Sequence, residues 1–383
     1  MRLLHTSDWH IGRSLHGADL LADQERVLTG LADLIRAEAV DVVLVPGDIY
    51  DRAIPPAAAI NVLDCVLTTL RATGAQIVIT PGNHDSSIRL GYAAGLLAAN
   101  GVHLRTNIAR LAEPVMIEDE YGPVGIYGIP YLEPDLVKGS LGVPQGRGHT
   151  DVLSAAMDQI RADQFRRGLS RSVVLAHAFV AGGAKGDCER DITVGGVEVV
   201  PADVFSGVTY VALGHLHRPQ QIASAIHYSG SPLAYSFTEA DQVKSVKVVE
   251  LDGNGLAGVT VHDLDRPRNL VTLIGTLDDL LTDPAHEQHV EDYVSARLMD
   301  ATRPVDAMRR LRERFAFCVH LDWTPVAAAG TDARTYMDRI VGRSDLAISA
   351  DFVQHVRATP ATPAETDLLC AAFAAGRVRE AAS

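Results

Sequence analysis

Cysteine is scarce in this chain of 383 residues, which contains only four of them. No two lie in a C-x-x-C pair, the spacing through which thiolates usually hold zinc. They are also too widely spaced to indicate the dense disulfide framework of a small secreted domain. We therefore expect neither a thiolate metal site nor a disulfide scaffold from Cys65, Cys188, Cys318 and Cys370.

Long apolar runs are missing as well. No segment is long and apolar enough to predict a span across a bilayer. The first fifteen residues also lack the unbroken apolar stretch of a signal peptide, because they include His5, Asp8, His10 and Arg13. The sequence therefore predicts a cytoplasmic protein.

Positive charge is in deficit. The chain has 4 lysines, 30 arginines and 48 acidic residues, which give a formal net charge of −14. This balance argues against a broad electropositive surface and, at first sight, against a polyanionic substrate such as nucleic acid. Net charge omits bound metal ions, however, and a local cationic site or a basic partner can bind phosphate within an acidic protein. The composition therefore does not exclude a nucleic-acid substrate.

The first two thirds of the chain have the pattern of a layered α/β domain, in which short β-branched runs alternate with amphipathic stretches. The β-branched runs predict strands at residues 2–6, 41–46, 76–81, 172–177 and 208–213. Apolar residues recur at three- and four-residue spacing between them, which predicts helices at residues 22–38, 56–71 and 151–167. Strand-like runs at 243–251 and 256–263 predict a closing β-meander over residues 226–263.

The last third is expected to form two smaller parts. A linker at residues 265–269 precedes a strand, a helix at 305–315 and a second strand within 291–324, which predict a small α/β module. A flexible composition at 327–331 then precedes two helix-like stretches at 349–356 and 363–375. The predicted domains are residues 1–268, 269–326 and 327–383.

Metal-binding side chains follow several of the predicted strands. Side chains just beyond the carboxyl ends of strands in an α/β sheet converge on one crevice, so these endings predict a single site. Glycine precedes three of the candidate ligands, at Gly47, Gly82 and Gly214, where the chain turns out of the sheet. The five segments are Asp8-Trp9-His10, Gly47-Asp48, Gly82-Asn83-His84-Asp85, His177 and Gly214-His215-Leu216-His217.

The candidate ligands comprise two carboxylates, one amide oxygen and four imidazoles. This is too many for a single zinc ion, which usually takes three or four protein ligands. Two divalent ions sharing a carboxylate fit the number better. Nitrogen and oxygen ligands without thiolate suit manganese, iron or zinc, and argue against calcium or a lone magnesium ion.

The ordered motifs D-x-H, G-D-x-x-D, G-N-H-D, H and G-H-x-H resemble those of the calcineurin-like metallophosphoesterase superfamily over about residues 1–263. The resemblance implies a layered α/β fold with two mixed β-sheets flanked by helices. It also implies two ligand sets that share Asp48 as a bridge. One ion would be held by Asp8, His10, Asp48 and His217, and the other by Asp48, Asn83, His177 and His215.

Longer stretches resemble one branch of that superfamily, the bacterial relatives of the eukaryotic double-strand-break repair nuclease. They are residues 5–12, 81–86, 189–192, 212–220 and 228–232. This resemblance implies a manganese-dependent DNA nuclease with 3′ to 5′ exonuclease and single-strand or hairpin endonuclease activity, Mg²⁺, iron or Zn²⁺ being alternative cations. It further implies a homodimer, a capping domain, and terminal helices that dock on a coiled-coil ATPase, although those helices can equally form a self-packing hairpin.

Three further residues are candidates for the chemistry. His84, beside the ligand Asn83, is placed to protonate the leaving 3′ oxygen or to stabilise the charged transition state. Asp85 is expected to hold His84 in its useful tautomer. Archaeal and eukaryotic relatives usually carry histidine where this chain has Asp51, which is expected to orient His84 or a ligand imidazole, a simple loop cap being an equal alternative.

Four arginines follow the motif residues and are candidates for contacts with DNA phosphates, for which the guanidinium fork is well suited. The strong preference of the chain for arginine over lysine is an alternative reason for their presence. The four are Arg13, Arg52, Arg89 and Arg218.

Two other functions stay open on the sequence alone, a stand-alone phosphatase or cyclic-nucleotide phosphodiesterase and a scaffold that has lost catalysis.

Overall fold

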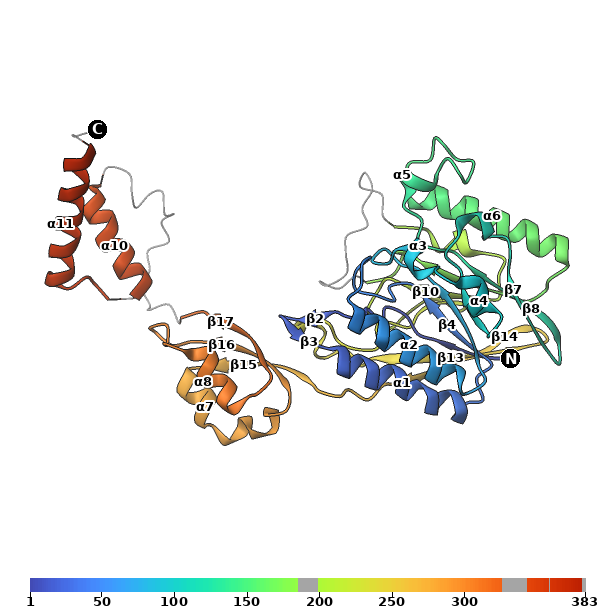
Figure 1. Cartoon of the computed structure of the whole chain (residues 1–383), viewed down its shortest axis with the longest axis horizontal. Coiled ribbons are helices and arrows are strands. Elements are labelled where there is room, and N and C mark those ends of the chain that lie inside the picture. The colour runs from blue at the N-terminus through green and yellow to red at the C-terminus, as the bar shows by residue number, and fades with distance from the viewer. Residues whose placement is uncertain (185–198, 326–342, 358, 381–383) are drawn as a thin grey trace. The chain divides into compact units, whose positions relative to one another are not determined.

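The computed structural model describes residues 1–184, 199–325, 343–357 and 359–380. The motif at 189–192, Cys188 and the predicted break at 327–331 lie outside these residues. The chain divides into two compact units, Met1–Asn269 and Leu270–Ser383 (Figure 1). This division falls one residue after the predicted end of the first domain, and the boundary predicted at 326/327 stays a prediction.

The first unit is built on two six-stranded mixed sheets. The first sheet has the order β14-β13-β1-β4-β5-β6, with bounds Gly255–Asp263, Ser245–Asp252, Arg2–His5, Val42–Pro46, Gln76–Thr80 and Val102–Leu104. The second has the order β11-β12-β10-β9-β8-β7, with bounds Gln220–Ala223, Ile226–Tyr228, Tyr210–Gly214, Ser172–His177, Gly122–Gly128 and Val115–Asp119. A two-stranded ribbon, β2 and β3, spans Ser14–Leu15 and Ala18–Asp19.

Helices cover the outer faces of these sheets (Figure 1). The three long ones are α1 (Leu21–Ala37), α2 (Ala57–Arg71) and α6 (His149–Arg167). Helix α1 buries Leu28, Leu31 and Ile35, which recur every three or four residues and therefore share one face. The short helices are α3 (Ser87–Leu90), α4 (Ala94–Ala98) and α5 (Pro134–Val137). No helix in the described residues is long and apolar enough to cross a membrane.

Three apolar layers hold the unit together. One lies between the first sheet and helices α1 and α2, one between the two sheets, and one between the second sheet and α6. The central strands are buried on both faces, which explains why β4 is almost entirely branched and apolar. The predicted fold class, a layered α/β fold with two mixed sheets, is confirmed.

The closing β-meander predicted over residues 226–263 is wrong. Strand β12 belongs to the second sheet, whereas β13 and β14 form a hairpin at the edge of the first. The segment between them includes a 3₁₀ turn at Phe237–Glu239 and carries the chain from one sheet to the other. Strand-like runs that follow one another in the sequence therefore pair in two different sheets, which local pattern alone does not reveal.

The second unit contains a small α/β module and a helical hairpin. The module is a parallel three-stranded sheet, β15 (Leu270–Gly275), β16 (Tyr293–Leu298) and β17 (Cys318–Trp323), with helices α7 (Leu277–Thr282) and α8 (Ala307–Arg314). Strand β15 and helix α7 come before residue 291 and were not among the elements predicted for this module. The two predicted terminal helices are longer in the structure, as α10 (Asp345–Arg357) and α11 (Pro363–Glu380), and they contact each other.

Candidate metal centre

The candidate site lies where parallel strands of the two sheets end. Strands β1, β4 and β5 run parallel in the first sheet, as do β8, β9 and β10 in the second, so their carboxyl ends lie at one edge of each sheet. The loops after β1 and β4 are joined by main-chain hydrogen bonds, in which the N–H groups of Asp8 and His10 donate to the carbonyls of Gly47 and Asp48. This pairing holds two ligand-bearing loops in fixed register.

The backbone is strained at this edge. Asp8, His10 and Asp48 have φ angles of 54°, 44° and 50°, and His215 has 105°. Positive φ is costly for residues with a side chain, by about 1–3 kcal/mol each, and such residues tend to concentrate at functional sites. Four of the seven predicted ligands therefore sit in a conformation that the fold imposes and that local preference opposes.

Two glycines show why the strand ends admit no larger residue. Gly47 has a φ of 90°, and a Cβ at this position would overlap the ring of His177. Gly214 does not have positive φ, but its Cβ would overlap the carbonyl oxygen of Pro46 in the other sheet. Gly47 thus provides the turn that the sequence predicts, whereas Gly214 is required by the close approach of the two sheets.

We expect Gly214→Ala to destabilise the chain by about 3 kcal/mol, because the added methyl group meets main-chain atoms that cannot move aside. Thermal melting followed by circular dichroism measures this. Gly30→Ala is the matched control, because nothing lies near its Cβ position within α1, and alanine there should be neutral or slightly stabilising. A Gly214→Ala chain that melts like the unaltered protein would contradict this account of the sheet contact.

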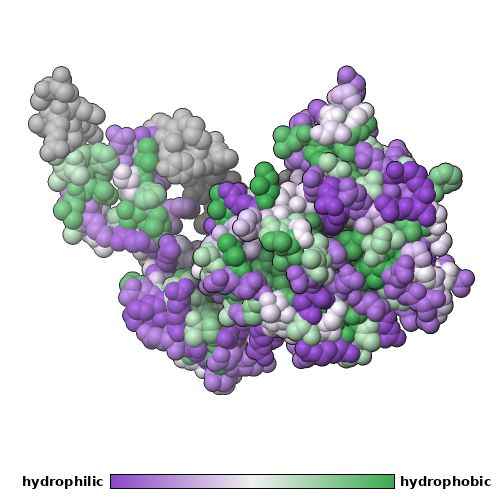
Figure 2. Space-filling model, turned by 45° about the vertical axis from the view of Figure 1, so that its right-hand side comes forward, coloured by the Kyte–Doolittle hydropathy of each residue, from purple (hydrophilic) through white to green (hydrophobic). Residues whose placement is uncertain are grey.

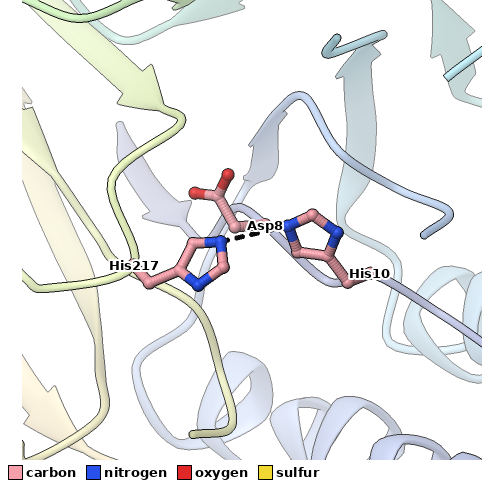
Figure 3. Close-up of side chains that lie close together, drawn as sticks. All are labelled: Asp8, His10 and His217. Carbon is pink, nitrogen blue, oxygen red and sulfur yellow. Dashed lines mark hydrogen bonds between the residues drawn. The ribbon is translucent and has the colours of Figure 1, made fainter. Parts of the chain in front are cut away.

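Three ligands form the first group, in which donor atoms of Asp8, His10 and His217 all lie within 4.8 Å of one another. The Nε2 atoms of the two imidazoles face each other at 3.1 Å, with the Asp8 carboxylate beside them (Figure 3). That separation suits two nitrogens that bind one ion at about 2.0–2.1 Å each. All three side chains are buried.

The second group brings Asp8, Asp48 and His177 within the same distance. Asp48 Oδ2 lies 3.4 Å from Nε2 of His10 and 3.5 Å from Nε2 of His177, so this carboxylate lies between one imidazole of each group. Asn83 Oδ1 lies 2.9 Å from His177 Nε2. The His215 ring packs against His177, and its main-chain N–H donates to Asp8 Oδ1 at 2.9 Å. The structure therefore brings all seven predicted ligands together.

The electrostatics of the cluster fit a pair of divalent cations. Burial, together with the neighbouring His217, His84, Arg13 and His177, lowers the pKa of His10 well below its ordinary value. Burial also lowers the pKa of His177. Both imidazoles are therefore neutral at pH 7, which is the form that binds metal. Asp8 and Asp48 are buried close to one another, and two buried carboxylates require compensating positive charge.

His84 lies at the rim of this cluster. Its Nδ1 donates a hydrogen bond to the main-chain carbonyl of Asp51 at 2.7 Å, and its Nε2 lies 4.0 Å from Asp48 Oδ2. Because a carbonyl oxygen only accepts, Nδ1 carries a proton and Nε2 faces the site. His84, His10 and Asp48 also form a third group of donors within 4.8 Å, so geometry alone does not separate an acid role from a ligand role.

The predicted contact between Asp85 and His84 is wrong. The Asp85 carboxylate instead accepts hydrogen bonds from the main-chain N–H groups of Ile49, Tyr50 and Gly82 at 2.9–3.0 Å. Burial, followed by the proximity of Asp48, raises the pKa of Asp85 to about 7. A carboxylate with three neighbouring main-chain donors is saturated locally, so Asp85 fastens the loops after β4 and β5 to each other rather than reaching the imidazole.

Asp51 is placed to act on two histidines. Its carbonyl holds His84, as described above, and its carboxylate lies 3.6 Å from Nδ1 of His10. The same carboxylate pairs with Arg13 at 3.6 Å, and the Arg13 guanidinium lies over the ring of Tyr235. Arg13 is thus largely buried in contacts within the protein. Arg52, Arg89 and Arg218, by contrast, are exposed.

Several residues beside the cluster escaped the sequence-based prediction. Ser7 Oγ donates to Asp8 Oδ2 at 2.6 Å, and the Tyr235 ring lies against His10 and His217. Glu239 approaches the far side of the His217 ring, with Nδ1 at 3.4 Å from its Oε1. Ser7 adjoins a motif and could have been found from its position, whereas Tyr235 and Glu239 carry no local signal because they reach the site through the crossing between the sheets.

Residues 1–219 match the family of calcineurin-like phosphoesterases, and the chain belongs to this family. Among curated proteins, it is similar to SbcD of the nuclease SbcCD from Staphylococcus epidermidis (strain ATCC 12228 / FDA PCI 1200). The two are 29% identical over 315 residues, which cover 82% of this chain and 83% of that protein. The predicted resemblance to this nuclease subunit is thereby confirmed.

Solved structures of other phosphoesterases are more distant. The calcineurin-like phosphoesterase YfkN from Bacillus subtilis is 13% identical, with a TM-score of 0.39, and the match covers 69% of this chain and 90% of that one. A dimetal phosphatase from Danio rerio is 12% identical, with a TM-score of 0.37, and the match covers 70% of this chain and 96% of that one. The family assignment rests on the sequence match over residues 1–219.

Proposed function

We propose that this chain is the nuclease component of an SbcCD-type complex, hydrolysing DNA phosphodiester bonds with two divalent metal ions, Mn²⁺ being preferred. The observation that carries the proposal is the cluster of seven nitrogen and oxygen ligands, all of them buried except the half-buried Asn83, in a chain similar over 82% of its length to an SbcD protein. The activities proposed are a 3′ to 5′ exonuclease on duplex ends and an endonuclease on single strands and hairpins. DNA repair, recombination and replication in the cytoplasm are the proposed setting.

The ligand sets proposed are Asp8, His10, Asp48 and His217 for one ion, and Asp48, Asn83, His177 and His215 for the other. Divalent cations in such a pair lower the pKa of water and neutralise the charge that develops on a phosphodiester. His84, held at Nδ1 by the Asp51 carbonyl, presents Nε2 to the site, and in its doubly protonated form it would pass the Nε2 proton to the leaving 3′ oxygen and become the neutral imidazole. The strained loops fix the ligands before substrate arrives, so little reorganisation accompanies the reaction.

The test is cleavage of end-labelled duplex and hairpin DNA by the purified chain with Mn²⁺, alongside bis(p-nitrophenyl) phosphate as a small phosphodiester. We expect a ladder of shortened DNA and release of nucleotides. The sequence has no G-x-x-x-x-G-K-[ST] loop, so ATP would enter through a partner, and the assay includes an SbcC-type ATPase with ATP. Hydrolysis of the small diester without any DNA cleavage, even with the ATPase, would favour the stand-alone phosphatase or cyclic-nucleotide phosphodiesterase instead.

The second unit supports a partner-dependent enzyme. The α/β module of β15–β17 is the proposed capping domain, and the hairpin of α10 and α11 is the proposed docking site for the ATPase coiled coil. A cavity of about 440 Å³ opens along the hairpin, lined by Phe352, Val353, Val356, Arg357, Glu365, Leu368 and Leu369. Figure 2 shows apolar (green) surface among the residues of these helices, at upper left. An apolar groove bounded by a bidentate Arg357–Glu365 ion pair suits an amphipathic helix.

We expect Phe352→Asp to weaken binding to the coiled coil of an SbcC-type ATPase at least tenfold, because a charge would replace a 57% exposed aromatic ring in the groove. Pull-down or surface plasmon resonance with the coiled-coil fragment measures this. Gln354→Asp is the matched control, because it adds the same charge at a neighbouring exposed position outside the groove. Equal binding by both variants would argue for a self-contained hairpin.

The proposed homodimer has a candidate surface beside the site. Ile88 on α3, Tyr92 in the turn between α3 and α4, and Leu96 on α4 are 89%, 82% and 75% exposed. The intervening Leu90 is buried and belongs to the core between the first sheet and its helices. Three large apolar side chains exposed within nine residues are more than a monomer usually shows in one segment, and they favour an interface.

We expect Tyr92→Asp to convert the dimer to a monomer in light scattering coupled to gel filtration, because the charge would be buried against a copy of itself in a two-fold contact. Leu136→Asp is the control, since Leu136 is 80% exposed but lies on α5. An unaltered dimer in the Tyr92→Asp chain would place the interface elsewhere.

A further inference from the structure

A lysine and a glutamate form a fully buried ion pair behind one metal ligand. Lys244 is 0% exposed and Glu239 is 1% exposed, and the Lys244 ammonium contacts the Glu239 carboxylate directly. Burying two charges carries a large desolvation cost, and a well-packed apolar pair is often equally stable or more so. A contribution to stability alone therefore does not explain why this ion pair is buried here, and its contacts with neighbouring groups point to another role.

Both members of the pair contact His217. The ammonium of Lys244 donates to the main-chain carbonyl of His217 at 3.0 Å and to Ser231 Oγ at 3.1 Å. The other oxygen of Glu239 lies 3.4 Å from Nδ1 of the same histidine. The main chain and the ring of His217 are thus restrained from one buried charge pair, on the side opposite the metal cluster.

The contact settles the tautomer of His217. A carboxylate that already accepts from Lys244 can only accept from an imidazole, so Nδ1 carries the proton and Nε2 presents its lone pair to a cation. Nε2 is the atom that faces His10 Nε2 at 3.1 Å in the cluster (Figure 3). An anionic acceptor behind an imidazole makes its other nitrogen a stronger metal donor.

The two proposed ion positions differ in the group that accepts a hydrogen bond from Nδ1 of a ligand imidazole. The His177 ring, on the other side of Asp48, donates from Nδ1 to the neutral carbonyl of Pro46 at 3.1 Å, whereas the carboxylate oxygen Oδ1 of Asp8 lies beyond hydrogen-bond distance from that nitrogen, at 3.9 Å. His217 has a carboxylate at the equivalent atom. The ring that faces Asp8 and His10 is therefore the better electron donor of the two, and the difference comes from Glu239.

We propose that Glu239 and Lys244 are positioning residues that fix His217 and strengthen the ion position formed with Asp8 and His10. This inference rests on the proposed two-metal site. It adds that the two ion positions differ in affinity, the position that includes His217 binding its ion more tightly. Lys244 holds Glu239 in place and neutralises the excess negative charge behind the ring, while Glu239 acts on the ring itself.

The test is calorimetric titration of Mn²⁺ into the metal-free full chain, with thermal melting recorded for each variant. Glu239→Gln keeps the shape and an oxygen acceptor but removes the charge. We expect the tighter of two Mn²⁺ equivalents to weaken about 10- to 100-fold and the weaker one to stay unchanged. Asp163→Asn is the matched control, a buried carboxylate that accepts from Tyr127 and pairs with Arg166 on α6. It should lower the melting temperature without altering either Mn²⁺ equivalent.

A second variant guards against misfolding. Glu239→Gln/Lys244→Met removes both buried charges together, so it should melt close to the unaltered chain while showing the same loss in the tighter equivalent. Unchanged Mn²⁺ binding in Glu239→Gln, or the same loss in Asp163→Asn, overturns the inference. Two Mn²⁺ equivalents bound without any DNA cleavage would overturn the proposed nuclease and leave this inference standing, whereas no Mn²⁺ bound by the unaltered chain would overturn both.

Discussion

Asp48→Asn should abolish DNA cleavage, with a loss of about a thousandfold or more, which corresponds to about 4 kcal/mol of transition-state stabilisation. The Asp48 carboxylate lies between one imidazole of each ligand group, 3.4 Å from His10 and 3.5 Å from His177. Asparagine retains the size of the side chain and one oxygen for the His84 main-chain N–H, which Asp48 Oδ1 accepts at 2.9 Å. The loss should therefore come from the missing charge rather than from unfolding.

Metal content distinguishes the shared carboxylate from an ordinary ligand. Mn²⁺ measured by atomic emission after gel filtration should fall from two ions per chain to one or none. Asp41→Asn is the matched control, because Asp41 precedes the opposite end of the same strand, β4, where it accepts from the Arg2 main chain. That variant should cleave DNA and bind Mn²⁺ normally. Two retained ions in Asp48→Asn would contradict a bridging position for this residue.

The sequence predicted the members of the cluster because parallel strands impose a simple rule on their ends. Asp8, Asp48 and His177 each follow or close a buried run, and the carboxyl ends of parallel strands meet at one edge. The rule requires no knowledge of long-range contacts within the sheet, only that the runs are strands and that they run parallel. This is why seven side chains spread over more than 200 residues were predicted together.

The supporting residues were not predictable in the same way. Asp85 lies in a motif beside His84, but its carboxylate accepts hydrogen bonds from three main-chain N–H groups instead of from the imidazole. Glu239 and Lys244 reach His217 from the crossing between the sheets, a segment that the sequence-based prediction placed within a single meander. The hydrogen-bond partner of a buried polar side chain depends on which distant segments pack beside it. The local pattern of a single sequence does not reveal those contacts.

The acidic composition is less of an obstacle to a DNA substrate once the structure is considered. Two divalent ions would offset four of the fourteen excess negative charges at the place where phosphate must approach. Arg52, Arg89 and Arg218 are exposed on segments that also carry ligands, whereas Arg13 is engaged by Asp51 and Tyr235. The first three are therefore the better candidates for phosphate contacts, and a basic partner would supply the remaining attraction.

His84→Gln should lower the turnover of DNA cleavage about 100- to 10,000-fold while both Mn²⁺ ions stay bound, because glutamine can fill the rim of the site but cannot deliver a proton. Single-turnover cleavage of labelled DNA and Mn²⁺ titration, measured on the same preparation, give the two quantities. His103→Gln is the control, since the His103 side chain on β6 hydrogen-bonds to Gln76, away from the ligand cluster. Because His84 also lies within reach of His10 and Asp48, a loss of one Mn²⁺ ion in His84→Gln would make this residue a ligand. Normal turnover would remove it from the mechanism altogether.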